Sequence, residues 1–253
     1  MCALFQPRVP DPPPSLEPAT NQFPKIQGGD IAASTYGKRV AGDFYDSLRV
    51  GPERVLFGLL DVAGRRASNQ AILSAAQNAF RTLGAELFSR PDFNEADAMT
   101  ELCIRLNRDL MEAARGVCSC PAFIGCYNEQ FGTLCYTNAG HTPALLGDSK
   151  GAVELNSTGL PLGLFSHATC EAPTVGLAKR AVLLVVSRGV VEGHSKTDKN
   201  EDFGLERVKQ CLLAQTSQSA QAWCASILKA VGEFTSEPLI AEDMSVLAFV
   251  RDP

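Results

Sequence analysis

Apolar residues recur along this chain with two different periods, and the period changes several times. Residues 71–88 and 94–114 carry apolar side chains three and four positions apart, which is the spacing of a helix with one buried face. Asn94 is a favourable N-cap for the second run. We therefore predict two long antiparallel helices in the first half of the chain.

Extended structure is predicted where the helical spacing is lost. Short runs of apolar or alternating residues, bounded by turn-forming residues, indicate strands. The predicted strands cover residues 26–35, 37–46, 55–60, 121–127, 132–138, 143–147, 152–155, 169–175, 181–186 and 243–250. The first two are expected to pair with each other, and residues 128–132 suit a hairpin turn.

Two more helices are predicted late in the chain, at residues 204–213 and 217–234. The order of strands and helices differs from the regular alternation that builds parallel sheets, so it predicts an α+β fold in layers with mostly antiparallel sheets. Residues 1–24 are rich in proline and lack either period. We expect them to form a tail or linker, followed by a single domain at residues 25–253.

Composition narrows the classes of partner. The chain has 253 residues, of which 45% are hydrophobic, and a net charge of -5. Nucleic acid and anionic membranes both select basic surfaces, so neither is expected as a partner. No apolar run approaches the roughly 20 residues that span a bilayer, and the N-terminus lacks the pattern of a signal peptide. We expect a soluble, cytoplasmic protein.

The cysteines favour the same compartment. None of the nine belongs to a C-x-x-C pair, most lie inside apolar runs, and Cys118 and Cys120 are too close together for a common zinc motif. Buried, reduced thiols are the simplest interpretation.

Acidic residues stand at the ends of several predicted strands or in the turns beside them. They are Asp43, Asp46, Asp61, Glu192, Glu242 and Asp243. Mg²⁺ and Mn²⁺ prefer oxygen ligands, so a few carboxylates brought together would suit either ion. Taken singly, each of these acids is more often a solvated turn residue.

Seven segments in a fixed order make the pattern specific. They are AGDFYD at residues 41–46, DVAG at 61–64, TNAGHTPALL at 137–146, STGLPLGLF at 157–165, LLVVSRGVVEG at 183–193, FGLERV at 203–208 and AEDMSVLAFVR at 241–251. This succession resembles the metal-dependent protein phosphatases of the PPM superfamily, and in particular the SpoIIE/RsbU-like branch of bacterial serine phosphatases. The resemblance runs from about residue 16 to residue 251.

The resemblance implies a four-layer α-β-β-α sandwich with two mostly antiparallel sheets flanked by helix pairs, and two Mn²⁺ or Mg²⁺ ions at one edge. Asp43 and Asp61 match the family's metal-binding aspartates, with Asp61 bridging both ions and the Val62 carbonyl as a further ligand. Glu242 and Asp243 match its last metal motif. On this reading Asp43, Asp61 and Glu242 are the catalytic residues, which hold metal so that an activated water attacks phosphorus.

One position departs from the family's pattern. Where the family has a metal-binding aspartate, this chain has Arg188, between Ser187 and Gly189. A unit-charge pair ~4 Å apart is worth about 4 kcal/mol at an effective dielectric of about 20, so facing a dication costs about twice that. One ion site is therefore expected to be weak or absent. Two explanations stay open, namely drift at an inactive site and a functional role for Arg188, for example in contacting phosphate.

Arg65 and Arg66 also depart from the family, which has Gly-His-Gly or Gly-Lys-Gly after the aspartate motif. Both are candidate phosphate contacts, because a guanidinium can bind phosphate through two N–H groups. Exposed arginines at a helix start are the simpler interpretation. His141 could donate a proton to a leaving alkoxide, or it could belong to a structural turn beneath the site.

The sequence thus predicts a Mn²⁺- or Mg²⁺-dependent phosphoserine and phosphothreonine protein phosphatase of bacterial signalling, weakened by Arg188. By the same resemblance, its partner would be a phosphorylated regulatory protein such as an anti-sigma-factor antagonist. The rival hypothesis is a non-catalytic pseudophosphatase that binds such a partner, because a fold alone does not establish activity.

Overall fold

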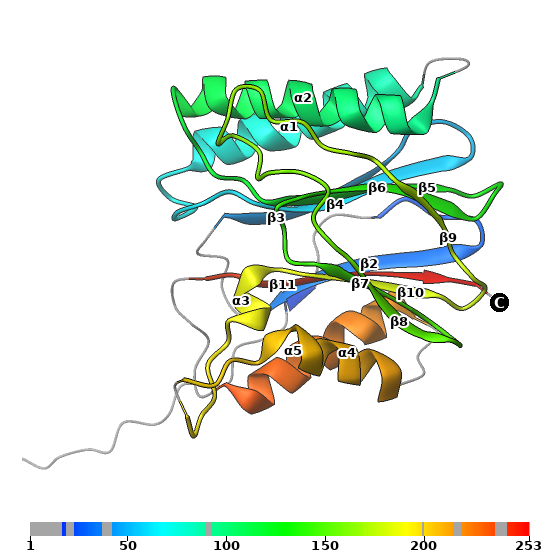
Figure 1. The fold of residues 1–253 in the computed structure, drawn as a ribbon, viewed down its shortest axis with the longest axis vertical. Helices are drawn as coiled ribbons and strands as arrows, with labels where there is room; N and C mark the ends of the chain where they lie inside the picture. Colours follow the sequence, from blue (N-terminus) through cyan, green and yellow to red (C-terminus); the bar gives the residue numbers. More distant parts are fainter. Residues whose placement is uncertain are drawn as a thin grey trace, which may run out of the picture.

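Two β-sheets lie face to face at the centre of the molecule, and a pair of helices covers the outer face of each (Figure 1). The computed structural model describes residues 17–18, 23–36, 42–89, 93–198, 200–214, 219–235 and 242–252. Every pairing between the named strands of this part of the chain is antiparallel. The predicted α+β, four-layer α-β-β-α sandwich is therefore confirmed.

One sheet has six strands in the order β1-β2-β11-β10-β7-β8. Its strands are β1 (Glu17–Pro18), β2 (Gly29–Tyr36), β11 (Met244–Arg251), β10 (Val182–Val186), β7 (Ala144–Asp148) and β8 (Gly151–Leu155). The last strand of the chain lies between β2 and β10, and it pairs with β2 from Met244, opposite Tyr36, to Arg251, opposite Gly29.

The other sheet has five strands in the order β3-β4-β5-β6-β9. Its strands are β3 (Asp43–Arg49), β4 (Arg54–Asp61), β5 (Ala122–Asn128), β6 (Thr133–Ala139) and β9 (Thr174–Gly176). β5 and β6 form the predicted hairpin. Asn128 shapes its turn, because Oδ1 accepts the backbone N–H groups of Gln130 at 3.1 Å and Phe131 at 3.2 Å.

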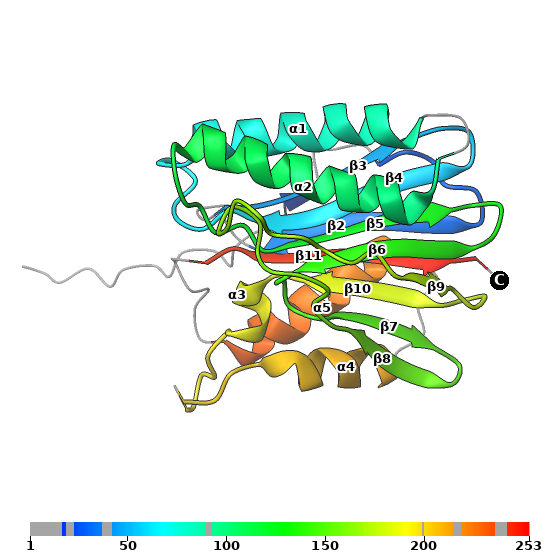
Figure 2. The same cartoon turned by 45° about the horizontal axis from the view of Figure 1, so that its top comes forward.

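The helices form the two outer layers (Figure 2). α1 (Gln70–Phe88) and α2 (Glu95–Ala114) cover the five-stranded sheet, and α4 (Gly204–Ala214) and α5 (Ala220–Phe234) cover the six-stranded one. A single helical turn, α3 (Arg188–Val191), follows β10. The predicted N-cap is confirmed, since Oδ1 of Asn94 accepts the N–H groups of Ala96 and Asp97. None of the helices in the described ranges has the length and apolar character needed to cross a bilayer.

Three apolar layers separate the four layers of secondary structure, and β4 shows how one strand serves two of them. Leu56 and Leu60 pack toward α1 and α2, whereas Phe57 and Leu59 point into the space between the sheets. Successive strand residues face opposite sides, so a strand buried on both faces is a continuous apolar run. This is why β4 could be predicted from sequence.

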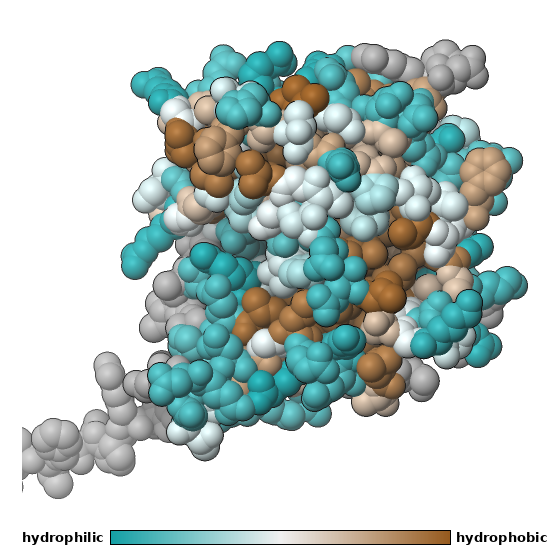
Figure 3. All heavy atoms as spheres, in the orientation of Figure 1, coloured by the Kyte–Doolittle hydropathy of each residue, from teal (hydrophilic) through white to brown (hydrophobic). Residues whose placement is uncertain are grey.

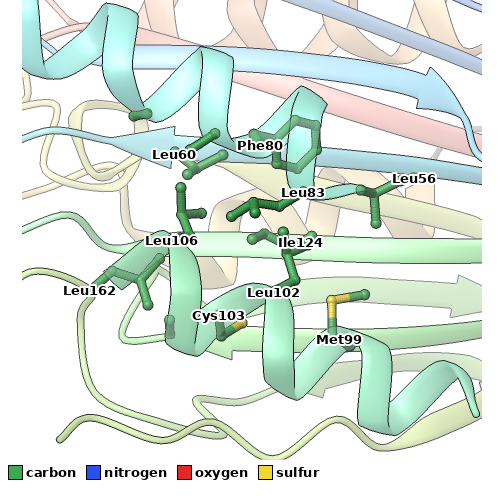
Figure 4. Packing of buried hydrophobic residues seen from close by; sticks show 14 of the residues in the cluster. Leu56, Leu60, Phe80, Leu83, Met99, Leu102, Cys103, Leu106, Ile124 and Leu162 are labelled. Atoms are coloured by element: carbon green, nitrogen blue, oxygen red, sulfur yellow. The ribbon is translucent and has the colours of Figure 1, made fainter. Parts of the chain in front are cut away.

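Each apolar layer joins particular elements. Under the first helix pair, Phe80 of α1 and Leu102 of α2 meet Leu60 and Ile124 of the sheet (Figure 4). Between the sheets, the ring of Phe57 stacks on that of Phe249, with centroids 6.1 Å apart. The third layer packs α5, with the buried Trp223 and Ile227, against β10 and β11. All described cysteines are free thiols, and all but Cys211 are buried, as expected.

Two strand predictions are wrong. Residues 26–35 and 37–46 do not pair, because β2 and β3 belong to different sheets, and β2 pairs instead with β11. The alternation of a strand records its buried face and not its partner. Of residues 169–175, only those from Thr174 onward form a strand, and Pro173 just before it has no N–H to donate to a sheet. Residues 37–41 lie outside the described part of the chain.

Two further details refine the predicted elements. The turn expected at residues 187–189 begins α3, in which the N–H of Glu192 donates to the carbonyl of Arg188 at 2.9 Å. Within the proline-rich segment, Glu17–Pro18 pairs with β2 as strand β1. The domain boundary after residue 24 stays a prediction.

Candidate functional site

Two buried carboxylates face each other at one end of the five-stranded sheet. Asp43 is the first residue of β3 and Asp61 the last of β4, and the antiparallel register places them directly opposite one another. Asp43 is 3% exposed and Asp61 is 8% exposed. Because β4 is buried on both faces, a slip of its register would misplace every core side chain, so the core fixes this pair.

The backbone next to these aspartates is closely packed. The N–H of Val62 donates to the carbonyl of Gly42 at 3.2 Å. A Cβ added to Gly42 would lie 1.7 Å from the Val62 carbonyl oxygen, so only glycine fits here. The predicted metal-ligating carbonyl of Val62 therefore lies against the backbone that immediately precedes Asp43.

The six-stranded sheet brings two more predicted segments to the same end of the molecule, where α3 and the start of β11 lie (Figure 1). Ser187 ties them together. Its N–H donates to the Ser245 carbonyl, its hydroxyl donates to the Asp243 carbonyl, and its Oγ accepts the Ser245 N–H, each at 2.9 Å. A Cβ on Gly189 would lie 2.3 Å from the Asp243 carbonyl oxygen. Arg188 is thereby held beside the segment that precedes β11.

Asp43 is a buried carboxylate whose surroundings disfavour its charged form. Burial first, and then the negative charges of Asp61 and Asp243, raise the pKa of Asp43 well above its usual value, against the effect of a hydrogen bond from Ser245. Its Oδ2 is buried and has no hydrogen-bond partner among the described residues. Burying such an oxygen lowers the stability of the fold unless a hydrogen-bond donor or a cation compensates.

Arg188 brings a positive charge to the site but is itself held by glutamates. Its Nη2 lies 3.0 Å from Oε1 of Glu242, and its Nε lies 3.8 Å from Oε2 of Glu192. Burial raises the pKa of Asp61 to about 6, and the charge of Arg188 counteracts that rise. Glu242, a predicted metal ligand, thus has a guanidinium partner in this structure.

These residues fit one divalent cation better than two. Among the described residues, no group of three or more acidic, histidine or cysteine side chains is arranged to hold a metal ion as it stands. Asp43 and Asp61 are nonetheless buried opposite each other with an unsatisfied oxygen, and a hard cation would relieve their repulsion. A second dication beside Glu242 would have to displace Arg188.

A pocket of about 590 Å³ opens beside Asp61 and Arg188. Its walls come from α3, from the turn at residues 140–143 and from the start of α4. A volume of this order accommodates a small ligand or an extended side chain. The face shown in Figure 3 is mainly hydrophilic below, around α4 and α5, and apolar at the upper left, over the end of α2.

His141 lines this pocket as a neutral imidazole. Burial lowers the pKa of His141 to about 4. Nδ1 lies 3.1 Å from the carbonyl of Thr142, which can only accept, so the proton is on Nδ1. Nε2 is buried and has no hydrogen-bond partner in the described part of the chain. Because Asn138 Oδ1 also accepts the backbone N–H of His141 at 2.8 Å, the arrangement favours a structural turn over proton donation.

Arg65 and Arg66 lie apart from Arg188. They line a separate pocket of about 630 Å³, together with Phe44 and residues of α1. Nη2 of Arg66 donates to the Asp43 carbonyl, while its Nε is buried without a partner among the described residues. Arg66 therefore supports the backbone of Asp43, and the structure does not bring the three predicted phosphate contacts into one pocket.

Asp46 does not join the other acids, although it belongs to the same segment as Asp43. Its two carboxylate oxygens accept hydrogen bonds from Nε and Nη2 of Arg81 at 2.6 and 2.8 Å. Sequence reasoning missed the roles of Ser187 and Ser245. The sequence offered one signal. Ser245 lies two residues after Asp243, and residues two apart in an extended chain lie on the same face, so Ser245 is expected on the face of Asp243, which is a neighbour of Asp43.

The comparisons with known proteins agree with this architecture. The family model described as Stage II sporulation protein E (SpoIIE) matches residues 51–252. Protein IcfG of Synechocystis sp. is 23% identical over 219 residues, which cover 79% of this chain and 34% of IcfG. The chain thus spans about a third of the length of this curated relative.

Two solved structures share the fold. The RsbU and RsbW domains of Rv1364c from Mycobacterium tuberculosis give a TM-score of 0.70 at 22% identity, over 91% of this chain and 62% of that one. The SiaA-PP2C domain of Pseudomonas aeruginosa gives a TM-score of 0.73 at 17% identity, over 89% of this chain and 86% of that one.

Proposed function

Because the chain belongs to the SpoIIE family of PP2C-type phosphatase domains, we propose that it is a metal-dependent protein serine/threonine phosphatase. The observation that carries the proposal is the pair Asp43 and Asp61, buried opposite each other with one carboxylate oxygen unsatisfied. Few reasons other than a cation justify keeping two carboxylates together out of water.

In this proposal the metal is Mn²⁺ or Mg²⁺, because the available ligands are oxygens. When bound, such an ion supplies charge to the phosphoryl group and lowers the pKa of the attacking water. Asp43, Asp61 and Asp243 would hold the cation, with the Val62 carbonyl as a further oxygen ligand. The pocket beside Asp61 and Arg188 receives the phosphorylated side chain.

The substrate we propose is a phosphorylated regulatory protein, with an anti-sigma-factor antagonist as the first candidate on family grounds. RsbU-type and SpoIIE-type domains among the structural relatives support a regulatory context. Arg188 lines the pocket and is half exposed, so it can contact a phosphate oxygen there. Arg65 and Arg66 are proposed to contact flanking parts of the partner, because they line the other pocket.

A second candidate function is that of a pseudophosphatase that binds the phosphoprotein without hydrolysing it. The ion pair between Arg188 and Glu242 favours it, because that pair removes one predicted ligand and adds a positive charge. The domain would then act by occupancy of its partner.

Phosphate release from a phosphoserine peptide, measured with Mn²⁺ or with EDTA, tests the proposal. We expect slow, Mn²⁺-dependent release that falls at least tenfold in Asp61→Asn, and no change in the control Asp109→Asn on α2. Phosphate release that is unchanged by EDTA and by Asp61→Asn would refute a metal-dependent enzyme. Binding of the phosphopeptide with no release in any condition would establish the pseudophosphatase.

A further inference from the structure

Among the described residues, the acids nearest Asp43 and Arg188 fall into two groups. Asp43, Asp61 and Asp243 are buried, and Oδ2 of Asp43 has no hydrogen-bond partner among the described residues. Glu242 and Glu192 are more exposed, and both contact Arg188. One oxygen of Asp43 thus lacks a partner in the described residues, whereas the two glutamates already share the guanidinium of Arg188.

The backbone of Arg188 is anchored, and its half-exposed side chain pairs with two glutamates. The three hydrogen bonds of Ser187 and the close approach of Gly189 to the Asp243 carbonyl anchor the first turn of α3 to β11. The guanidinium is then held between Glu242, from the segment before β11, and Glu192, four residues further along the chain. A swing of Arg188 out of the site would break both contacts and leave two glutamates unpaired.

This position already holds a positive charge without a metal ion. The guanidinium of Arg188 offsets one of the two negative charges that Glu242 and Glu192 bring to it. Glutamate at 242 also reaches one methylene further than aspartate, which suits contact with a side chain at 188 better than chelation at the buried pair. The two departures from the family's pattern, Arg188 and Glu242, are therefore complementary.

We propose that Arg188 is a resident cation of this site, with its guanidinium in place of a second metal ion and Glu242 as its anchor. This inference rests on the proposed function, because it assumes that one exchangeable cation binds beside Asp43 and Asp61. The guanidinium offers N–H donors to a phosphate oxygen in the adjoining pocket, but it cannot activate water. The site is then a hybrid centre of one metal ion and one arginine.

The number of Mn²⁺ ions bound per chain tests the proposal, by calorimetric titration and by the loss of the free-ion signal in electron paramagnetic resonance. Wild type is expected to bind one ion and Arg188→Asp two. The double variant Arg188→Asp with Glu242→Gln is expected to return to one ion. Glu242→Gln alone should keep one ion with an affinity within about threefold of wild type, because Glu242 does not hold that ion.

Arg105→Asp is the matched control, because it reverses an arginine that pairs with Glu86 on the surface, away from the site. It should leave the count at one. If Arg188→Asp fails to fold by circular dichroism, Arg188→Asn replaces it and should admit a second, weaker ion.

The outcomes separate this inference from the proposed function. Two ions in wild type, or one ion both in wild type and in whichever Arg188 variant folds, overturn the resident cation and leave a metal-dependent phosphatase standing. No ion in wild type or in either variant overturns both. A loss of tenfold or more in the affinity of Glu242→Gln shows that Glu242 is a metal ligand and also overturns the inference.

Discussion

At the scale of single residues, burial decides what each acid and base of the site can do. Asp43 and Asp46 are three residues apart, yet one lacks a donor for Oδ2 and the other is satisfied by Arg81. The same contrast separates Glu242, which has a guanidinium partner, from Asp43, whose Oδ2 has no hydrogen-bond partner among the described residues. Chemical type identified these residues as candidates, and only their neighbours assign them to ion pairs or to the proposed metal centre.

His141 gives a prediction at this scale. Its pKa is about 4 in the folded protein and about 6.5 in an unfolded chain, so between these values the unfolded state binds more protons. The contribution of His141 to the free energy of unfolding is therefore complete above about pH 6.5. It is lost as the pH falls toward 4, by up to about 3 kcal/mol. Burial raises the pKa of Asp61, which has the opposite effect, so the wild type alone does not isolate His141.

Comparison of the wild type with His141→Gln isolates the contribution of His141 to stability. Urea unfolding across this pH range should show a weaker loss of stability toward acid in the variant than in the wild type. His167→Gln, at an exposed position, serves as the control and should follow the wild type. Parallel curves for wild type and His141→Gln would mean that His141 is not held neutral by the fold.

At the scale of elements, the junction between α3 and β11 decides where Arg188 stands. The turn is closed by Gly189, which leaves no room for a side chain between α3 and the Asp243 carbonyl. β4 and β3 form the other half of the site, and their register is enforced by core residues on both faces. The two halves come from different sheets, so the site depends on how the sheets are placed against each other.

Gly189→Ala is expected to destabilise the protein by at least about 2 kcal/mol, because the new methyl group would meet backbone atoms that cannot rotate away. Urea unfolding measures this. Gly176→Ala, in β9, is the control, since a Cβ there meets nothing within 4 Å, and its effect should stay within about 0.5 kcal/mol. Equal stability of the two variants would show that the junction is loose.

Most elements could be predicted from the sequence, because their periods are local properties. α1, α2, β4 and β10 lie within a few residues of their predicted positions. The partner of β2 could not be predicted, since nothing in residues 29–36 distinguishes a neighbour in the chain from β11. For the site, the motifs predicted the approach of Asp43 to Asp61, whereas the contact of Arg188 with Glu242 depends on side-chain geometry that spacing does not encode.

At the scale of the whole molecule, three apolar layers hold the four layers of secondary structure together. The outer two are separated by both sheets and the core between them. Changes in one outer layer should therefore be felt little in the other.

Ile124→Val in the layer beneath α1 and α2, and Ile227→Val in the layer beneath α4 and α5, should each cost about 1 kcal/mol. Their combined cost should equal the sum within about 0.5 kcal/mol, measured by urea unfolding. Ile124→Val combined with Leu102→Ala, within one layer, should deviate by more than that. Strong coupling between Ile124 and Ile227 would contradict independent layers.

The position of β11 has a consequence for the order in which the protein is made. Thr35 on β2 contacts Ser245 on β11 at 3.1 Å, across 210 residues of chain. During translation, β2 and β10 therefore lack the strand that joins them until β11 has been made. Until then their edges are exposed to pairing with other chains. The five-stranded sheet with α1 and α2 can form earlier, so Asp43 and Asp61 should meet well before Arg188 and Glu242 do.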